Sequence, residues 1–143
     1  MSSLEKAIQI AVRAHLGQVD KASQPYILHP IRVMLRLTSQ DERIAGVLHD
    51  VIEDTAVSYD ELRSEGFSDA ILCALEALTK RPGESRLEAA ARAAANPIAK
   101  AVKLADNAEN MDLSRIPNPT ARDLARLEEY KAVRALLTGA SEA

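Results

Sequence analysis

Four ionisable side chains lie within an apolar segment, residues 44–54, that is long enough to form a buried helix. They are His49, Asp50, Glu53 and Asp54. A buried carboxylate without a partner is so unfavourable that it is normally neutralised, paired or bound to a metal ion. At helical spacing Glu53 lies one turn beyond His49, and Asp54 lies one turn beyond Asp50. The segment therefore predicts a polar site on the face of a buried helix.

A metal site in this segment needs ligands from elsewhere, because two residues of one turn cannot enclose an ion. His29 precedes Pro30, which predicts a helix that has this proline as its first residue and His29 at its entrance. Asp106 is a carboxylate within another mostly apolar helical run. With His49 and Asp50, these residues would offer two nitrogen and two oxygen ligands. Manganese, iron, nickel, cobalt and zinc all suit such a set, so coordination chemistry alone does not choose among them.

Two alternatives remain for these residues. His29 taken alone is more often a core or capping histidine, and the four residues together could form an inert buried network. The set is rich in carboxylates, however, and has no arginine beside it in sequence. A divalent cation would satisfy these carboxylates better than such a network.

The order His, then His-Asp, then Asp resembles that of the HD phosphohydrolase superfamily. Neighbouring motifs narrow the resemblance to the hydrolase domain of the RelA/SpoT family and to its stand-alone small hydrolases, which degrade guanosine tetraphosphate (ppGpp). The motifs, which lie in register over residues 4–113, are HLGQ (15–18), PYILHP (25–30), LHDVIEDT (48–55), KLAD (103–106) and NM (110–111). The resemblance implies an all-α HD-domain bundle and a divalent metal ion, manganese. The implied ligands are His29, His49, Asp50 and Asp106.

Further side chains are implied for catalysis and substrate binding. Glu53 and Asp54 lie near a helix C-terminus, where the helix dipole disfavours carboxylates. Their position therefore indicates a functional role. In the family, the matching pair accepts the proton of the attacking water and orients the attack. Lys21 and Asn110 match substrate-contacting positions, and Lys103 would help to neutralise phosphate. For Lys21 and Lys103, a simple solvated lysine is the alternative.

Two positions depart from the family pattern in the region that would bind the base. Asp20 stands where the family usually has an arginine that stacks on guanine, and Leu113 stands where it has a threonine near the nucleoside. Asp20 would then accept hydrogen bonds from a guanine edge, or the chain would prefer another phosphorylated nucleotide. The resemblance therefore supports the reaction class more directly than it supports specificity for a particular base.

Composition favours one all-α domain over residues 1–143. Hydrophobic residues make up 47% of the chain and aromatic residues 3%, so the core must consist mainly of Leu, Ile, Val and Ala. No alternating strand pattern persists, and we expect a compact bundle of seven or eight helices. Cys73 lies in an apolar stretch and is expected to be buried. The predicted helix starts are Ser2, Pro30, Ser39, Ser58, Ser68, Ser85, Asn96 and Asn118.

Charge and hydropathy argue against nucleic acid and a membrane as partners. A net charge of −3 and a pI near 5.6 argue against nucleic acid as the main partner. No apolar run approaches the roughly 18 residues of a membrane span, and no signal peptide is visible, so we expect a cytoplasmic protein without a membrane partner.

The predicted function is metal-dependent hydrolysis of ppGpp or pppGpp, with release of the 3′ pyrophosphate. The small phosphorylated nucleotide would be the only partner implied. We expect a stand-alone hydrolase, because 143 residues leave no room for an alarmone synthetase domain. One alternative is an HD phosphohydrolase that acts on a different phosphorylated nucleotide. The other is a nucleotide-binding sensor with slow turnover.

Overall fold

The computed structural model describes residues 3–114 and 116–139. Within these ranges the chain is all-α, as expected, and the one β-type pairing is an isolated bridge between Val19 and Pro25. Nine helices are present in the described residues, more than predicted, because the central segment is divided in two. They are α1 (Leu4–Ala14), α2 (Leu28–Leu35), α3 (Gln40–Leu48), α4 (Val51–Asp54), α5 (Tyr59–Ser64), α6 (Asp69–Leu78), α7 (Arg86–Ala94), α8 (Pro97–Asn110) and α9 (Ala121–Thr138).

Polar caps fix most of the helix starts. The predicted N-caps of α3, α5, α6, α7 and α8 are confirmed, each with a side-chain oxygen that accepts a backbone N–H of the first turn. Ser2 lies outside the described residues, and the N-cap of α1 is Ser3. The prediction for α9 was wrong: it begins after Thr120, not at Asn118. Thr120 and Asp123 form a capping box, which satisfies two otherwise free N–H groups.

Helix α2 begins two residues before the predicted proline. Pro30 is tolerated in the first turn because the N–H groups there have no partner within the helix. His29 therefore belongs to the helix instead of preceding it. On this helix Val33 is fully buried, whereas Leu35 is 71% exposed.

The central segment is not one continuous helix. Helix α3 ends at Leu48 and α4 begins at Val51, with His49 and Asp50 in a turn between them. The Nδ1 atom of His49 donates to the carbonyl oxygen of Gly46 at 2.5 Å. An uninterrupted helix would offer that oxygen to the N–H of residue 50, so the side chain competes with the helical hydrogen bond. The break places both residues at the end of α3.

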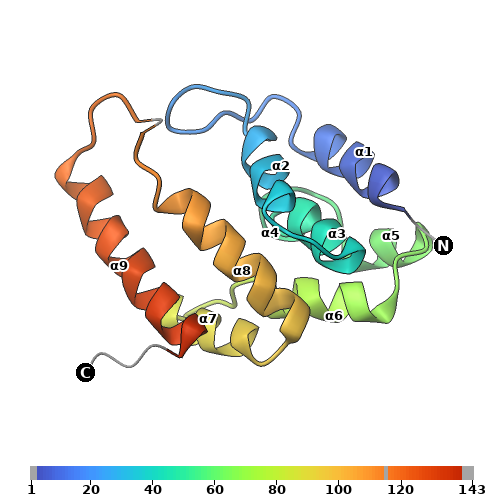
Figure 1. The fold of residues 1–143 in the computed structure, drawn as a ribbon. Coiled ribbons are helices and arrows are strands. Elements are labelled where there is room, and N and C mark those ends of the chain that lie inside the picture. Colours follow the sequence, from blue (N-terminus) through green and yellow to red (C-terminus); the bar gives the residue numbers. More distant parts are fainter. Residues whose placement is uncertain (1–2, 115, 140–143) are drawn as a thin grey trace.

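Helix α3 lies at the centre and packs against α1, α2, α6 and α8, while α9 covers α7 and α8 (Figure 1). Gly46 permits the close approach of α2, since an added Cβ would lie 2.7 Å from Leu37 Cδ1 and 3.6 Å from Met34 Cα. Cys73 was expected in the core but is exposed, because it faces outward between buried Leu72 and Ala74 of α6.

The loop before α2 and the loop before α9 lie at the same end of the bundle (Figure 1). In the described part of the chain, no helix is both long and apolar enough to cross a lipid bilayer.

Candidate metal and nucleotide site

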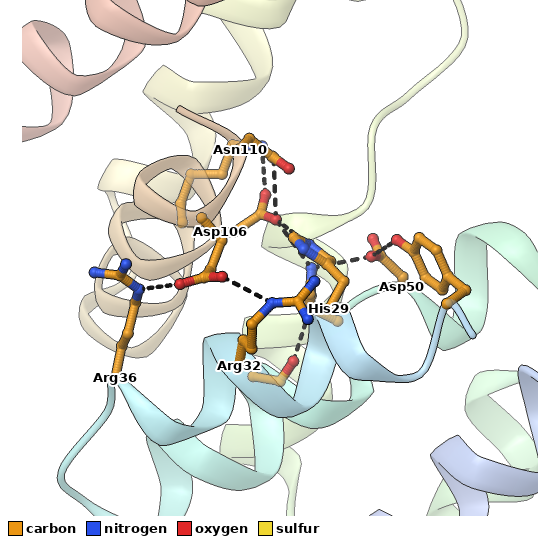
Figure 2. A network of polar contacts seen from close by, with 11 residues as sticks. His29, Arg32, Arg36, Asp50, Asp106 and Asn110 are labelled. Carbon is orange, nitrogen blue, oxygen red and sulfur yellow. Dashed lines mark hydrogen bonds and ion pairs between the residues drawn. The ribbon is translucent and has the colours of Figure 1, made fainter. Parts of the chain in front are cut away.

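Three buried side chains meet where α2, the α3–α4 turn and α8 come together. His29, His49 and Asp106 each offer one ligand atom, and these atoms all lie within 4.8 Å of one another. Asp106 Oδ1 lies 2.8 Å from His29 Nε2 and 3.4 Å from His49 Nε2. Figure 2 shows His29 and Asp106 pointing toward one another from their separate helices. This His/Asp cluster could hold a divalent metal ion.

The hydrogen bonding of His49 fits a metal ligand. Because Nδ1 donates to the Gly46 carbonyl, the neutral ring presents a lone pair at Nε2. This Nε2 is buried and makes no hydrogen bond, although Asp50 Oδ2 lies only 3.1 Å away. A backbone carbonyl that fixes the tautomer is the usual support of a metal-binding histidine. The donor set present in the chain therefore suits a divalent cation.

Asp50, the fourth predicted ligand, lies beside this cluster. Its Oδ2 accepts a hydrogen bond of 2.5 Å from the hydroxyl of Tyr26 and also faces His49 Nε2. The three clustered ligand atoms belong to His29, His49 and Asp106, so Asp50 is adjacent to the group without being part of it. Whether these four residues bind metal stays a prediction.

The charges of the site favour a cation at its centre. Burial opposes a charge on His49, but Asp50 and Asp106 outweigh that effect and raise the pKa of His49 well above its ordinary value. Burial likewise opposes charge on Asp106, yet the contacts with His29 and His49 lower its pKa well below the usual range. The carboxylates thus favour a positive charge at His49 Nε2, which either a proton or a metal ion supplies.

The predicted catalytic pair lies on α4, on the solvent side of the turn. Glu53 and Asp54 are both exposed. Partial desolvation and the charges of Asp54 and Asp50 raise the pKa of Glu53, and desolvation together with Asp50 raises the pKa of Asp54. A carboxylate with a raised pKa is a stronger base at neutral pH.

A pocket of about 430 Å³ opens beside the cluster, and it reaches from the loop before α2 to α9. Two of the predicted substrate residues, Lys21 and Asn110, line it. Lys21 Nζ pairs with Asp123 Oδ1 at 2.9 Å, and Asn110 Nδ2 donates to Asp106 Oδ1 at 3.3 Å. Lys103 is not among the lining residues, but its Nζ lies 3.6 Å from Asp106 Oδ2.

The two departures from the family pattern both lie in this pocket. Asp20 Oδ1 accepts hydrogen bonds from the backbone N–H groups of Ala22 and Gln24, at 2.8 and 3.0 Å. Asp20 therefore orders the loop that carries Lys21, a role that the sequence alone does not indicate. Leu113 contributes an apolar wall.

Sequence reasoning missed the contributions of Tyr26 and of helix α9. Asp123, Arg126 and Tyr130 line the pocket from α9, about 100 positions after the loop that they face. Their spacing of three and four places them on one helix face, but no pattern in the sequence pairs that face with the metal cluster. Tyr26 belongs to the PYILHP motif, but the sequence does not indicate that its hydroxyl donates a hydrogen bond to Asp50.

An all-α bundle that brings His29, the His49-Asp50 pair and Asp106 together defines an HD-type domain. A 3′-pyrophosphohydrolase of guanosine-3′,5′-bis(diphosphate) from Borreliella burgdorferi is 43% identical over 82 residues, which are 54% of this chain and 12% of that protein. A GTP pyrophosphokinase of Streptomyces coelicolor is 33% identical over 150 aligned residues, 96% of this chain and 17% of that protein. No family model matches the chain.

A solved structure gives the same fold. It is described as a metazoan ortholog of SpoT that hydrolyses ppGpp, and it superposes with a TM-score of 0.75 at 23% identity, over 97% of this chain and 85% of that one. The chain is thus an HD domain of the RelA/SpoT type. It spans only 12% and 17% of the lengths of the two curated relatives.

Proposed function

We propose that this chain hydrolyses ppGpp or pppGpp in a metal-dependent reaction that releases the 3′ pyrophosphate. The observation that carries the proposal is the buried cluster of His29, His49 and Asp106 at the wall of a pocket of about 430 Å³. Relatives named as 3′-pyrophosphohydrolases of this nucleotide support it, as does the likeness to the ppGpp-hydrolysing ortholog of SpoT. In this proposal residues 1–143 act as a single HD hydrolase domain.

The proposed metal ligands are His29, His49, Asp50 and Asp106, and the proposed ion is Mn²⁺. A divalent ion held by these residues would polarise a phosphoryl oxygen and would lower the pKa of a water molecule. Two imidazoles and two carboxylates are compatible with manganese, and the resemblance to RelA/SpoT hydrolases favours that ion. Lys103, at 3.6 Å from Asp106 Oδ2, adds positive charge beside the ligand set.

Glu53 and Asp54 are the proposed general base pair. Each has a raised pKa, so each holds a proton more readily than an ordinary exposed carboxylate. Their place on α4, one turn beyond His49 and Asp50, supports a role in accepting the proton of the attacking water. Proton transfer to a positioned carboxylate typically contributes a factor of about 10²–10⁴ to the rate.

The nucleotide is proposed to lie in the pocket between the loop before α2 and α9. Lys21 and Arg126 bring positive charge to this pocket, and Asn110 lies beside Asp106 to contact the nucleoside. Asp20 is occupied with the loop backbone, which supports a change in base recognition relative to the family. A related nucleotide as the preferred substrate is therefore the second candidate function.

A panel of nucleotides tests this proposal. The purified chain, loaded with Mn²⁺, should release pyrophosphate from ppGpp, lose the activity on chelation and regain it when Mn²⁺ is restored. Release of free phosphate from simple nucleotides, without pyrophosphate from ppGpp, would favour the second candidate. Tight binding of ppGpp without any product would contradict both and indicate a sensor.

A further inference from the structure

The hydroxyl of Tyr26 makes a direct hydrogen bond to Asp50, the one proposed metal ligand outside the tight cluster. The donor oxygen lies 2.5 Å from Asp50 Oδ2. The same carboxylate oxygen lies 3.1 Å from His49 Nε2. Asp50 Oδ2 therefore lies between the hydroxyl of Tyr26 and the imidazole of His49.

The ring of Tyr26 is fixed by its neighbours, so the hydroxyl has a defined position. The His15 and Tyr26 rings have centroids 5.1 Å apart, and the Tyr26 and His29 rings have centroids 5.7 Å apart. The backbone N–H of Tyr26 also donates to the Gln18 carbonyl at 2.8 Å. Rings packed on both sides and a bonded backbone leave the side chain few other rotamers.

The carboxylate of Asp50 lies beside the atom of His49 that would bind the ion, because its Oδ2 is 3.1 Å from His49 Nε2. The hydrogen bond from the Tyr26 hydroxyl holds that oxygen and leaves the other oxygen of Asp50 available. Tyr26 therefore keeps the Asp50 carboxylate at the edge of the site.

We propose that Tyr26 is a positioning residue for the metal site, one that orients the Asp50 carboxylate for ligation through the hydroxyl-to-Oδ2 hydrogen bond. The inference rests on the proposed function only in requiring a divalent ion at this cluster. Loss of an outer hydrogen-bonding partner of a metal ligand typically lowers metal affinity by about 10–100-fold. The same loss is expected for Tyr26→Phe, which removes the hydroxyl and keeps the packed ring.

The test is a calorimetric titration of Mn²⁺ into the full chain without nucleotide. Tyr26→Phe should raise the Kd for Mn²⁺ by about 10–100-fold. Tyr59→Phe is the matched control, since the Tyr59 hydroxyl donates to Thr79 Oγ1 at 3.2 Å and not to a proposed ligand, so the Kd of this variant should equal that of the wild type. The melting temperature of the metal-free proteins is measured alongside.

A second readout separates positioning from a general structural role. If Tyr26 acts through metal affinity, a large excess of Mn²⁺ should restore the turnover of Tyr26→Phe to near the wild-type value. An unchanged Kd in Tyr26→Phe, with wild-type activity intact, would overturn this inference and leave the proposed function standing. A wild-type protein that binds Mn²⁺ with the help of Tyr26 but hydrolyses no ppGpp would overturn the proposed function alone. A wild type that binds no Mn²⁺ would overturn both.

Discussion

Lys21 Nζ and Asp123 Oδ1 lie 2.9 Å apart and join the loop before α2 to the first turn of α9. Both side chains line the same pocket, although 102 positions separate them in sequence. The Lys21 side chain is about half exposed, whereas Asp123 is buried and also accepts hydrogen bonds from Thr120. One of the three N–H donors of the Lys21 ammonium group is therefore already bonded to Asp123, and two remain at the pocket.

We predict that Lys21→Met raises the KM for ppGpp about tenfold with little change in kcat, which corresponds to about 1.4 kcal/mol of binding. The reason is the loss of one of the cations that line the pocket, at a residue that is not proposed to transfer a proton. Steady-state kinetics at saturating Mn²⁺ would measure it. Lys6→Met is the control, because Lys6 pairs with Glu65 away from the pocket and should leave KM unchanged.

Glu53→Gln should lower kcat by about 10²–10⁴ while the Kd for Mn²⁺ stays at the wild-type value. The amide keeps the shape of the side chain but cannot accept a proton. Because the pKa of Glu53 is raised above 4.5, wild-type activity should fall as the pH drops through a value above that of an ordinary carboxyl group. Glu128→Gln, an exposed change on α9, serves as the control. An unchanged rate in Glu53→Gln would remove Glu53 from the mechanism.

Glu109 connects α8 to α2 and so fixes the helices that carry Asp106 and His29. Its Oε1 lies 3.0 Å from Arg32 Nε, and its Oε2 lies 2.5 Å from Arg36 Nε. Glu109 is only 6% exposed, so its removal leaves two guanidinium groups without their anion. Glu109→Gln should lower the free energy of unfolding by about 2–3 kcal/mol, below the full range for a buried pair because Arg36 is half exposed.

Urea denaturation followed by circular dichroism measures this change. Glu129→Gln is the matched control, because the Arg86–Glu129 pair is exposed and should contribute less than about 1 kcal/mol. Equal effects of the two substitutions would show that burial of Glu109 adds nothing to the pair.

Stability should fall in acid over a defined range. The hydrogen bonds from Arg92 hold the pKa of Glu84 at about 2, against 4.5 for the free side chain. The backbone N–H of Thr120 and the Lys21 side chain hold the pKa of Asp123 at about 2, against 3.8. A pKa lowered by folding stabilises the fold above the unfolded value, and this stabilisation is lost as the pH falls toward the folded value.

Unfolding midpoints should therefore drop between about pH 4.5 and pH 2. Glu84→Gln should flatten that dependence, whereas an exposed carboxylate without a cap, such as Glu128, should not affect it when changed to Gln. A midpoint that stays constant across the range would contradict the role of these contacts.

The residues that meet in the buried cluster could be predicted from sequence more fully than the pocket around them. Ionisable residues in apolar runs are conspicuous because they conflict with burial, and these runs contain His49, Asp50 and Asp106. The break after α3 could not be predicted, because it depends on the hydrogen bond that the His49 side chain donates to the Gly46 carbonyl. The α9 side of the pocket could not be predicted either, since Lys21 and Asp123 meet only through the tertiary fold.

The predicted burial of Cys73 was wrong because the phase of its helix was uncertain by one residue. Cys73 and Leu35 both lie in apolar stretches, where neighbouring positions look alike in sequence but face opposite sides of a helix. The capping residues were more reliable, because the cap is a local hydrogen bond between residues three positions apart.

The central claim is that a divalent ion is bound jointly by His29, His49, Asp50 and Asp106. Its most direct test is elemental analysis of the Mn²⁺-loaded protein after removal of free metal, for the wild type and for Asp106→Asn, with circular dichroism to confirm that both are folded. The account predicts about one ion per chain in the wild type and a large loss in Asp106→Asn, because an amide is a much weaker ligand than a carboxylate. Asp112→Asn, in the same pocket but not a proposed ligand, should retain the ion. Equal metal content in the wild type and Asp106→Asn, or a wild type without metal, would contradict the account.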